Sequence, residues 1–209
     1  MSDETVIDSA EKLTAIGVEA LQEPTEIAPP AEISAEESAY REALAKHSAL
    51  IARIVPPHTK VSRQVTLEDV NKESFHTDIQ DLFQLCFTPN GLYGGAYAMH
   101  HSQIDDKDPL SVFVMNNMLV VINPVITRHS NYTRDSEEAC MSFSGLKMIT
   151  VQRWQKMEVS YQTVIIDPSD EKRYVLSEMK TEALSGNPSL VFQHEIDHGN
   201  AKFIYELNK

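Results

Sequence analysis

Acidic residues are concentrated at the beginning of this chain, and this asymmetry restricts where a folded core can form. Residues 1–38 contain ten Asp or Glu side chains, one Lys, three prolines, and no aromatic residue or cysteine. A segment with a high charge of one sign and few large apolar side chains cannot offset the entropy lost on ordering. We therefore expect a largely disordered extension over 1–33, a helical linker over 34–55 and the folded domain over 56–209.

The charge of the whole chain excludes several classes of partner. The net charge is −13, from 31 acidic and 18 basic side chains among 209 residues. Because phosphate binding needs clustered Lys and Arg, we expect neither nucleic acids nor anionic membranes as partners. No apolar run approaches the ~20 residues of a membrane-spanning helix, and the acidic start resembles no targeting signal. Two cysteines, Cys86 and Cys140, do not make a disulfide scaffold, so we expect a reducing cytoplasm.

Hydrophobic periodicity after the acidic segment predicts a helix, several strands and a final helix. Capping-box patterns at Ser34 and Thr77 each precede apolar residues at helical spacing, and Pro56 should end the first of these helices. The expected strands cover 61–67, 111–115, 118–122, 151–154, 158–166 and 173–178. Because strands and helices do not alternate regularly, the order predicts an α+β fold with antiparallel or mixed sheets.

The last predicted helix carries a pattern that is typical of a metal site. Asn187 and Pro188 indicate a helix start, with asparagine as the cap and proline in the first turn. His194 and His198 are four residues apart, so both imidazoles project from one side of the helix and could hold one ion. Glu195 lies beside them, where it could act as general base and then general acid. The alternative is a terminal helix with two solvated histidines.

Two imidazoles leave such a centre short of a third protein ligand. Cys140 is the candidate, because it lies in a polar stretch before a predicted strand and a thiolate binds borderline or soft ions strongly. The alternative is an ordinary buried thiol, which is the role we expect for Cys86 on the apolar face of its helix.

Three segments, in chain order, resemble the three motifs of the peptide deformylase family. The third motif, Q-H-E-x-D-H, is matched in full by residues 193–198. The second, E-G-C-L-S, is similar to residues 138–142, and the first, G-x-G-L-A-A-x-Q, is loosely matched by residues 93–100. The resemblance covers about residues 54–205 and indicates a divergent, phage-type member. It implies an α+β fold in which antiparallel or mixed sheets pack around a central metal-binding helix.

The resemblance implies a metal-dependent hydrolase that removes the formyl group from formyl-methionyl peptides and releases formate. Cys140, His194 and His198 would bind one divalent ion, with ferrous iron as the usual metal and zinc or nickel as substitutes. Glu195 would take a proton from the attacking water and pass it to the leaving amine. We also expect an ion pair between Arg153 and Glu138, which the resemblance favours.

The resemblance further implies two hydrogen-bond donors for the oxyanion of the reaction. One is the backbone N–H of Met141, and the other is the glutamine that ends the first motif. In the match over 93–100 this glutamine is replaced by His100, whose ring N–H could donate instead, and His101 takes that place if the register shifts by one residue. The methionine side chain of the substrate would lie near Gly94, Gly95, Leu190 and Val191.

Two other functions are compatible with the sequence. A catalytically impaired relative could keep the ion for folding and bind peptides or a protein partner, and a different zinc hydrolase could cleave internal peptide bonds. Retention of Glu195 favours catalysis over the first, and Cys140 disfavours the second, because such peptidases usually use a carboxylate or histidine there. The expected substrates are formyl-methionyl peptides or nascent chains in the cytoplasm of a bacterium or a phage-infected cell. The acidic extension could serve as a tether, a solubility tail or a docking segment for the ribosome.

Overall fold

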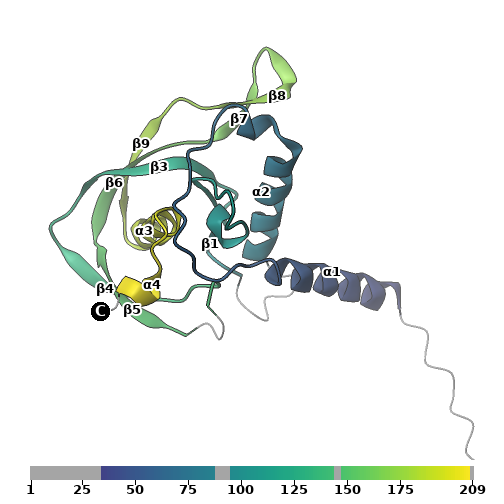
Figure 1. Ribbon diagram of the computed structural model, residues 1–209, viewed down its shortest axis with the longest axis horizontal. Coiled ribbons are helices and arrows are strands. Elements are labelled where there is room, and N and C mark those ends of the chain that lie inside the picture. The colour runs from purple at the N-terminus through teal and green to yellow at the C-terminus, as the bar shows by residue number, and fades with distance from the viewer. Residues whose placement is uncertain (1–33, 88–94, 144–146, 208–209) are drawn as a thin grey trace, which may run out of the picture. The chain divides into compact units, whose positions relative to one another are not determined.

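The computed structural model describes residues 34–87, 95–143 and 147–207 (Figure 1). The extension expected over 1–33 and Gly94 lie outside these residues. The chain divides after Ser34, and every element below belongs to the unit Ala35–Lys209. Its helices are α1 (Ala35–Ile51), α2 (Glu73–Cys86), α3 (Asn187–Gly199) and α4 (Ile204–Leu207), with two short 3-10 helices, η1 (Asp69–Asn71) and η2 (His101–Gln103).

The strands of the described residues form three antiparallel sheets, which confirms the α+β class. The largest has the order β1-β2-β3-β6-β9, and the other two pair β4 with β5 and β7 with β8. The strands are β1 (Ala98–His100), β2 (Val112–Met115), β3 (Val120–His129), β4 (Thr133–Glu138), β5 (Ile149–Trp154), β6 (Lys156–Gln162), β7 (Val164–Asp167), β8 (Asp170–Leu176) and β9 (Lys180–Ser185).

Helix α3 contacts strands of two different sheets, β1 and β9 of the largest sheet and β5 of the β4–β5 pair. Its Phe192 is buried and packs edge-on against Phe113 of β2, with ring centroids 5.1 Å apart. Ile196, one turn later, is half-buried against the same apolar cluster. These contacts hold one face of α3 in the core and leave its neighbouring face to the site described below.

Helix α2 covers another part of the largest sheet. Leu82, Leu85 and Cys86 are buried with Met99 of β1 and Val114 of β2. Burial raises the pKa of the Cys86 thiol to about 12, so it stays protonated, and its expected role as a core residue is confirmed. The apolar side chains that predicted this helix are therefore the ones that attach it to the sheet.

Several element boundaries differ from the sequence prediction because backbone partners decide them. The strand expected over 61–67 is only an isolated bridge from Arg63 to Leu110, since its polar groups bond to different elements: Ser62 N donates to Gly199 O and Val65 N to the side chain of Asn123. The strand expected over 158–166 is two strands, because β6 pairs with β3 and β9 whereas β7 pairs with β8.

The helix ends were also displaced, and three strands were missed. Helix α2 begins at Glu73 and not at Thr77, whose hydroxyl instead donates to the carbonyl of Glu73. Helix α1 ends at Ile51, before the proline expected to stop it, and the cap of α3 is Gly186 with φ 65°. Strands β1, β4 and β9 were not expected, because β1 is short and the β4 and β9 sequences are mostly polar.

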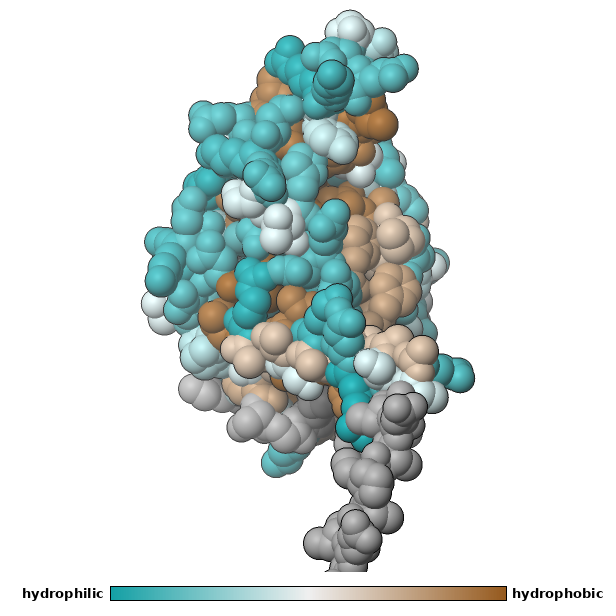
Figure 2. Space-filling view, turned by 90° about the vertical axis from the view of Figure 1, so that its right-hand side faces the viewer, coloured by the Kyte–Doolittle hydropathy of each residue, from teal (hydrophilic) through white to brown (hydrophobic). Residues whose placement is uncertain are grey.

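The β7–β8 hairpin is attached to the domain by one face only. Val164, Tyr174 and Leu176 pack against the apolar cluster around Phe75, whereas Ile165 and the following Ile166 are exposed. In Figure 2, hydrophobic residues near the top of the view lie on either side of hydrophilic ones. Among the described helices, none combines the length and apolar character needed to cross a bilayer.

Candidate metal centre

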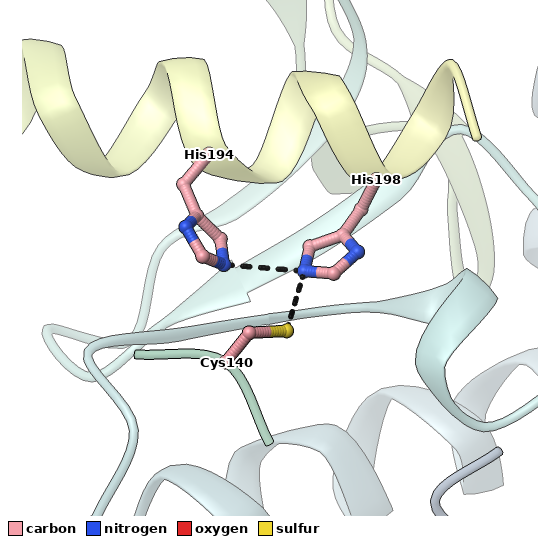
Figure 3. A group of neighbouring side chains, drawn as sticks. All are labelled: Cys140, His194 and His198. Atoms are coloured by element: carbon pink, nitrogen blue, oxygen red, sulfur yellow. Dashed lines mark hydrogen bonds between the residues drawn. The ribbon is translucent and has the colours of Figure 1, made fainter. Parts of the chain in front are cut away.

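The structure brings together the three side chains that the sequence proposed as metal ligands. Cys140 follows β4, and His194 and His198 project from one side of α3 (Figure 3). The Cys140 Sγ atom lies 3.2 Å from His198 Nε2, which lies 3.2 Å from His194 Nε2. The four-residue spacing produces this arrangement, because residues four apart on an α-helix are neighbours on its surface.

This donor set fits one divalent ion. A tetrahedral ion with nitrogen ligands at ~2.1 Å and a sulfur ligand at ~2.3 Å separates its ligand atoms by about 3.4–3.6 Å. The three atoms here lie within 4.8 Å of one another, and both imidazoles present Nε2. Two neutral imidazoles and one thiolate suit zinc and the divalent ions of iron and nickel.

The orientation of His194 is set by a buried ion pair. His194 Nδ1 lies 2.9 Å from Glu138 Oε2, so Nδ1–H donates to this carboxylate and the lone pair of Nε2 faces the other ligands. Arg153 donates from Nε and Nη2 to the two oxygens of Glu138, each at 2.8 Å, and from Nη1 to Asp197. The expected pairing of Arg153 with Glu138 is therefore confirmed.

Electrostatics keep Glu138 ionised although it is buried. Burial opposes the charge, but the hydrogen bonds from Arg153 and His194 outweigh it and lower the pKa of Glu138 to about 2. A carboxylate that stays charged holds the Nδ1 proton of His194, and with it the tautomer that a metal ligand requires.

Glu195 follows His194 on α3 and is buried. Its side chain is 3% exposed, and its Oε2 has no hydrogen-bond partner among the described residues. Burial is the main reason that its pKa rises, to about 7, and the nearby carboxylate of Glu138 acts in the same direction. A free carboxylate oxygen with a pKa near neutrality suits proton transfer in both directions.

A glutamine that sequence reasoning missed lies beside the cysteine. Gln103 of η2 directs its Nε2 toward Ser142 Oγ at 3.3 Å and toward Cys140 Sγ at 3.8 Å. Its Oε1 accepts from the backbone N–H of His100 at 2.8 Å, which fixes the amide. The only signal in the sequence was the glutamine itself: when the last residue of the first motif is aligned with Gln103, both motif glycines fall on alanines, Ala96 and Ala98.

The assignment of an oxyanion donor to His100 is accordingly corrected. The Nδ1 of His100 accepts from the backbone N–H of Ser102 at 3.0 Å, and burial lowers the pKa of the ring to about 3. The alternative, His101, points elsewhere, with Nδ1 accepting from Leu110 N and Nε2 3.4 Å from Asp78. Among the described residues, neither ring is hydrogen-bonded to Cys140.

The remaining predicted site residues lie around the three ligands. Met141 follows Cys140 in a turn closed by a hydrogen bond from Phe143 N to Cys140 O, 3.2 Å long. Leu190 and Val191 are half-buried one turn before His194 and Glu195. Val191 packs against the core, whereas Leu190 shares the face of His194 because it is four residues away.

Gly95 sits against the end of α2, where a side chain has no room. A Cβ added to Gly95 would lie 1.9 Å from the carbonyl oxygen of Cys86 and 2.7 Å from its carbon. The segment that leads into β1 can therefore approach α2 this closely only because residue 95 is glycine.

We expect Gly95→Ala to lower the free energy of unfolding by about 1–3 kcal/mol, because backbone must shift to accept the methyl group. Urea denaturation measures the change. Glu171→Ala, at an exposed position of the β7–β8 hairpin, is the control and should unfold near the wild-type midpoint. Equal stability of the two variants would contradict the predicted clash.

The sequence and the fold both resemble those of peptide deformylases. The family model for polypeptide deformylase matches residues 96–209. A peptide deformylase from Thermotoga neapolitana is 36% identical over 100 residues, 46% of this chain and 54% of that protein, so the chain spans about half the length of this relative. One from Aquifex aeolicus is 27% identical over 154 residues, 69% of this chain and 79% of that protein.

The likeness to solved structures concerns the fold. A class I type b peptide deformylase from Acinetobacter baumannii, solved with Met-Ala-Ser bound, has a TM-score of 0.57 at 18% identity, and the match covers 74% of this chain and 96% of that one.

Proposed function

Because the chain belongs to the polypeptide deformylase family, we propose that it hydrolyses the N-formyl group of formyl-methionyl peptides and releases formate. The observation that carries this proposal is the pairing of the Cys140, His194 and His198 cluster with Glu195, a buried carboxylate whose Oε2 has no partner among the described residues. A site that only stabilised the fold would gain nothing from an unpaired carboxylate next to it, because burying one is costly.

One divalent ion bound by these three residues would supply Lewis-acid activation of a water molecule and of the formyl oxygen. We propose ferrous iron as the native ion, with zinc or nickel as replacements. The α3 helix would then be the central metal-binding helix between the sheets, and its contacts with β1, β9 and β5 support that placement.

Glu195 moves the proton in both halves of the reaction. It takes a proton from the water whose oxygen attacks the formyl carbon, and then gives this proton to the amine nitrogen as the carbon–nitrogen bond breaks. The products are formate and a peptide with a free amino terminus. A pKa of about 7 for Glu195 allows both transfers near neutral pH.

Gln103 and Met141 would hold the oxyanion that forms after the attack. The Nε2 of Gln103 already points to the cysteine side of the site, and the backbone N–H of Met141 belongs to the residue after Cys140. Donors held in place before the reaction stabilise the transition state without a cost of reorganisation.

We expect Gln103→Met, which keeps the side-chain length, to lower kcat by about 10²–10³-fold with little change in metal content. The measurement is steady-state formate release together with metal analysis. His100→Gln is the comparison, because a glutamine at the position first assigned to the donor should not restore activity to Gln103→Met. A Gln103→Met enzyme as fast as the wild type would remove this residue from the oxyanion site.

The remaining parts of the proposal concern substrate and setting. The relative from Acinetobacter baumannii was solved with Met-Ala-Ser, and we propose that Gly95, Leu190 and Val191 contribute to an apolar pocket for a methionine side chain. We propose nascent chains in a bacterial or phage-infected cytoplasm as substrates, and a ribosomal surface as the partner of the acidic extension.

The test is formate release from formyl-Met-Ala-Ser by protein loaded anaerobically with ferrous iron or nickel. Formate from the wild type and none from Cys140→Ala would support the proposal. If folded, metal-loaded protein released no formate, a peptide-binding role would replace it. Cleavage of an internal peptide bond in an unformylated peptide would instead support a peptidase.

A further inference from the structure

Two buried ring nitrogens near the end of α3 have no hydrogen-bond partner among the described residues. They are Nε2 of His100, which is completely buried, and Nδ1 of His198, which is 1% exposed. The two rings are roughly parallel, with centroids 6.4 Å apart. Buried polar groups without a partner are rare in folded proteins, and each one calls for an explanation.

Both nitrogens are donors. The Nδ1 of His100 accepts the backbone N–H of Ser102, so the proton of the neutral ring is on Nε2. The Nε2 of His198 faces Cys140 Sγ and His194 Nε2, so the proton of this ring is on Nδ1 whenever Nε2 serves as a ligand. Two N–H groups cannot bond to each other, and both need an acceptor.

The backbone of Gly199 lies close to the Nε2 side of the His100 ring. A Cβ at Gly199 would lie 3.1 Å from His100 Nε2 and 3.6 Å from His100 Cε1, and apart from its chain neighbours and its own helix no other described atom lies within 4 Å. In Figure 3 the second ring nitrogen of His198 points away from Cys140 and toward the end of α3, where Gly199 lies. The two donors therefore border the same region.

We propose that one buried water molecule binds beside Gly199, accepts hydrogen bonds from His100 Nε2–H and His198 Nδ1–H, and makes His100 a positioning residue for the metal ligand His198. A water with two to four polar partners is a normal part of a protein interior. Metal-binding histidines generally donate their second N–H to a carboxylate, a carbonyl or a water. His194 uses Glu138 in this way, and His198 uses the water held by His100.

The effect on metal binding rests on the proposed function, whereas the water itself does not. His100→Asn keeps an acceptor for the Ser102 N–H at the position of Nδ1 but removes the donor at Nε2. His100→Gln keeps a donor near Nε2 but removes that acceptor. The two variants therefore separate the role of the Nε2 donor from that of the acceptor for Ser102 N–H. His76→Asn on α2, where the ring packs against Tyr174, is the control.

We expect zinc and nickel affinity, measured by competition with a chelator, to fall about 10–100-fold in His100→Asn, and to stay near the wild-type value in His100→Gln and His76→Asn. Gly199→Ala should weaken binding in the same way, because the added methyl group would lie 3.1 Å from His100 Nε2 and push this ring away from the water, although alanine favours a helix over glycine. Wild-type affinity in both His100→Asn and Gly199→Ala would overturn the positioning role.

High-resolution crystal structures of the metal-free and metal-loaded wild type test the water directly. Density within hydrogen-bond distance of both nitrogens supports the proposal, and its absence from both structures overturns it. A wild type that binds no metal but shows this water would contradict the proposed function and leave the water site standing. A wild type that binds metal but shows no such water would contradict the water site and leave the proposed function standing.

Discussion

Replacing Glu195 by glutamine is expected to lower the rate of formate release by about 10²–10⁴-fold, the usual contribution of a general acid–base group. The amide has the shape of the carboxyl group but cannot take a proton from water at neutral pH. The metal content should not change, because Glu195 is outside the ligand cluster formed by Cys140, His194 and His198. Formate release and metal analysis on the same preparation measure both effects.

Stability provides a second readout for the same variant. Burial raises the pKa of Glu195, which means that the folded protein disfavours its charged form. A neutral amide avoids that cost, so Glu195→Gln without metal should be at least as stable to urea as the wild type. The exposed Glu178→Gln is the matched control and should retain activity. If Glu195→Gln kept most of the wild-type rate, Glu195 would not be the base.

Replacing Arg153 by methionine is expected to lower the free energy of unfolding by about 3–5 kcal/mol, because it leaves the carboxylate of Glu138, which is largely shielded from water, without its guanidinium partner. The Arg153 side chain is 4% exposed, and it bonds to Glu138, which is 9% exposed, and to Asp197. Metal affinity should fall as well, since Glu138 holds His194 in its ligand orientation. Urea denaturation of the metal-free protein and chelator competition measure the two losses.

Two further variants identify the cause of that loss. Arg128 is exposed, so Arg128→Met should change stability by no more than about 0.5 kcal/mol. Adding Glu138→Gln to Arg153→Met should recover part of the stability, because the orphaned charge is removed and contacting residues are not additive. A loss of less than about 1 kcal/mol in Arg153→Met would show that the pair behaves as a solvated surface pair.

The position of Gln103 shows where reading the chain alone failed. The first motif was aligned with residues 93–100 through its glycines, and part of this segment lies outside the described residues. Gln103 lies in the 3-10 helix η2 after β1. There the backbone of His100 and the hydroxyl of Ser142 hold its amide beside Cys140. Ser142 is 39 residues away in the chain, so local pattern could not reveal this contact.

Local sequence pattern was sufficient to predict a feature wherever the interactions that determine it join residues close together in the chain. The i, i+4 spacing of His194 and His198 with Glu195 between them, the apolar faces of α2 and α3, and the alternation in β5 follow from helix and strand periods. His194, His198 and Glu195 were proposed as site residues on this ground, and Cys140 was proposed from its motif. Local pattern did not predict strands β1, β4 and β9, because the strands that they pair with lie elsewhere in the chain.

The sequence by itself predicted the α+β class and proposed His194, His198 and Glu195 as site residues, since these depend on residue types at short spacings, and it proposed Cys140 from its motif. Only the tertiary structure decided which side chain reaches Cys140 as a donor and how His194 is oriented by Glu138 and Arg153. It also decided that His100 lies behind His198 beside Gly199. The physical reason is that hydrogen bonds act over about 3 Å in space, whereas these partners are separated by tens of residues and meet only when the sheets and α3 have packed.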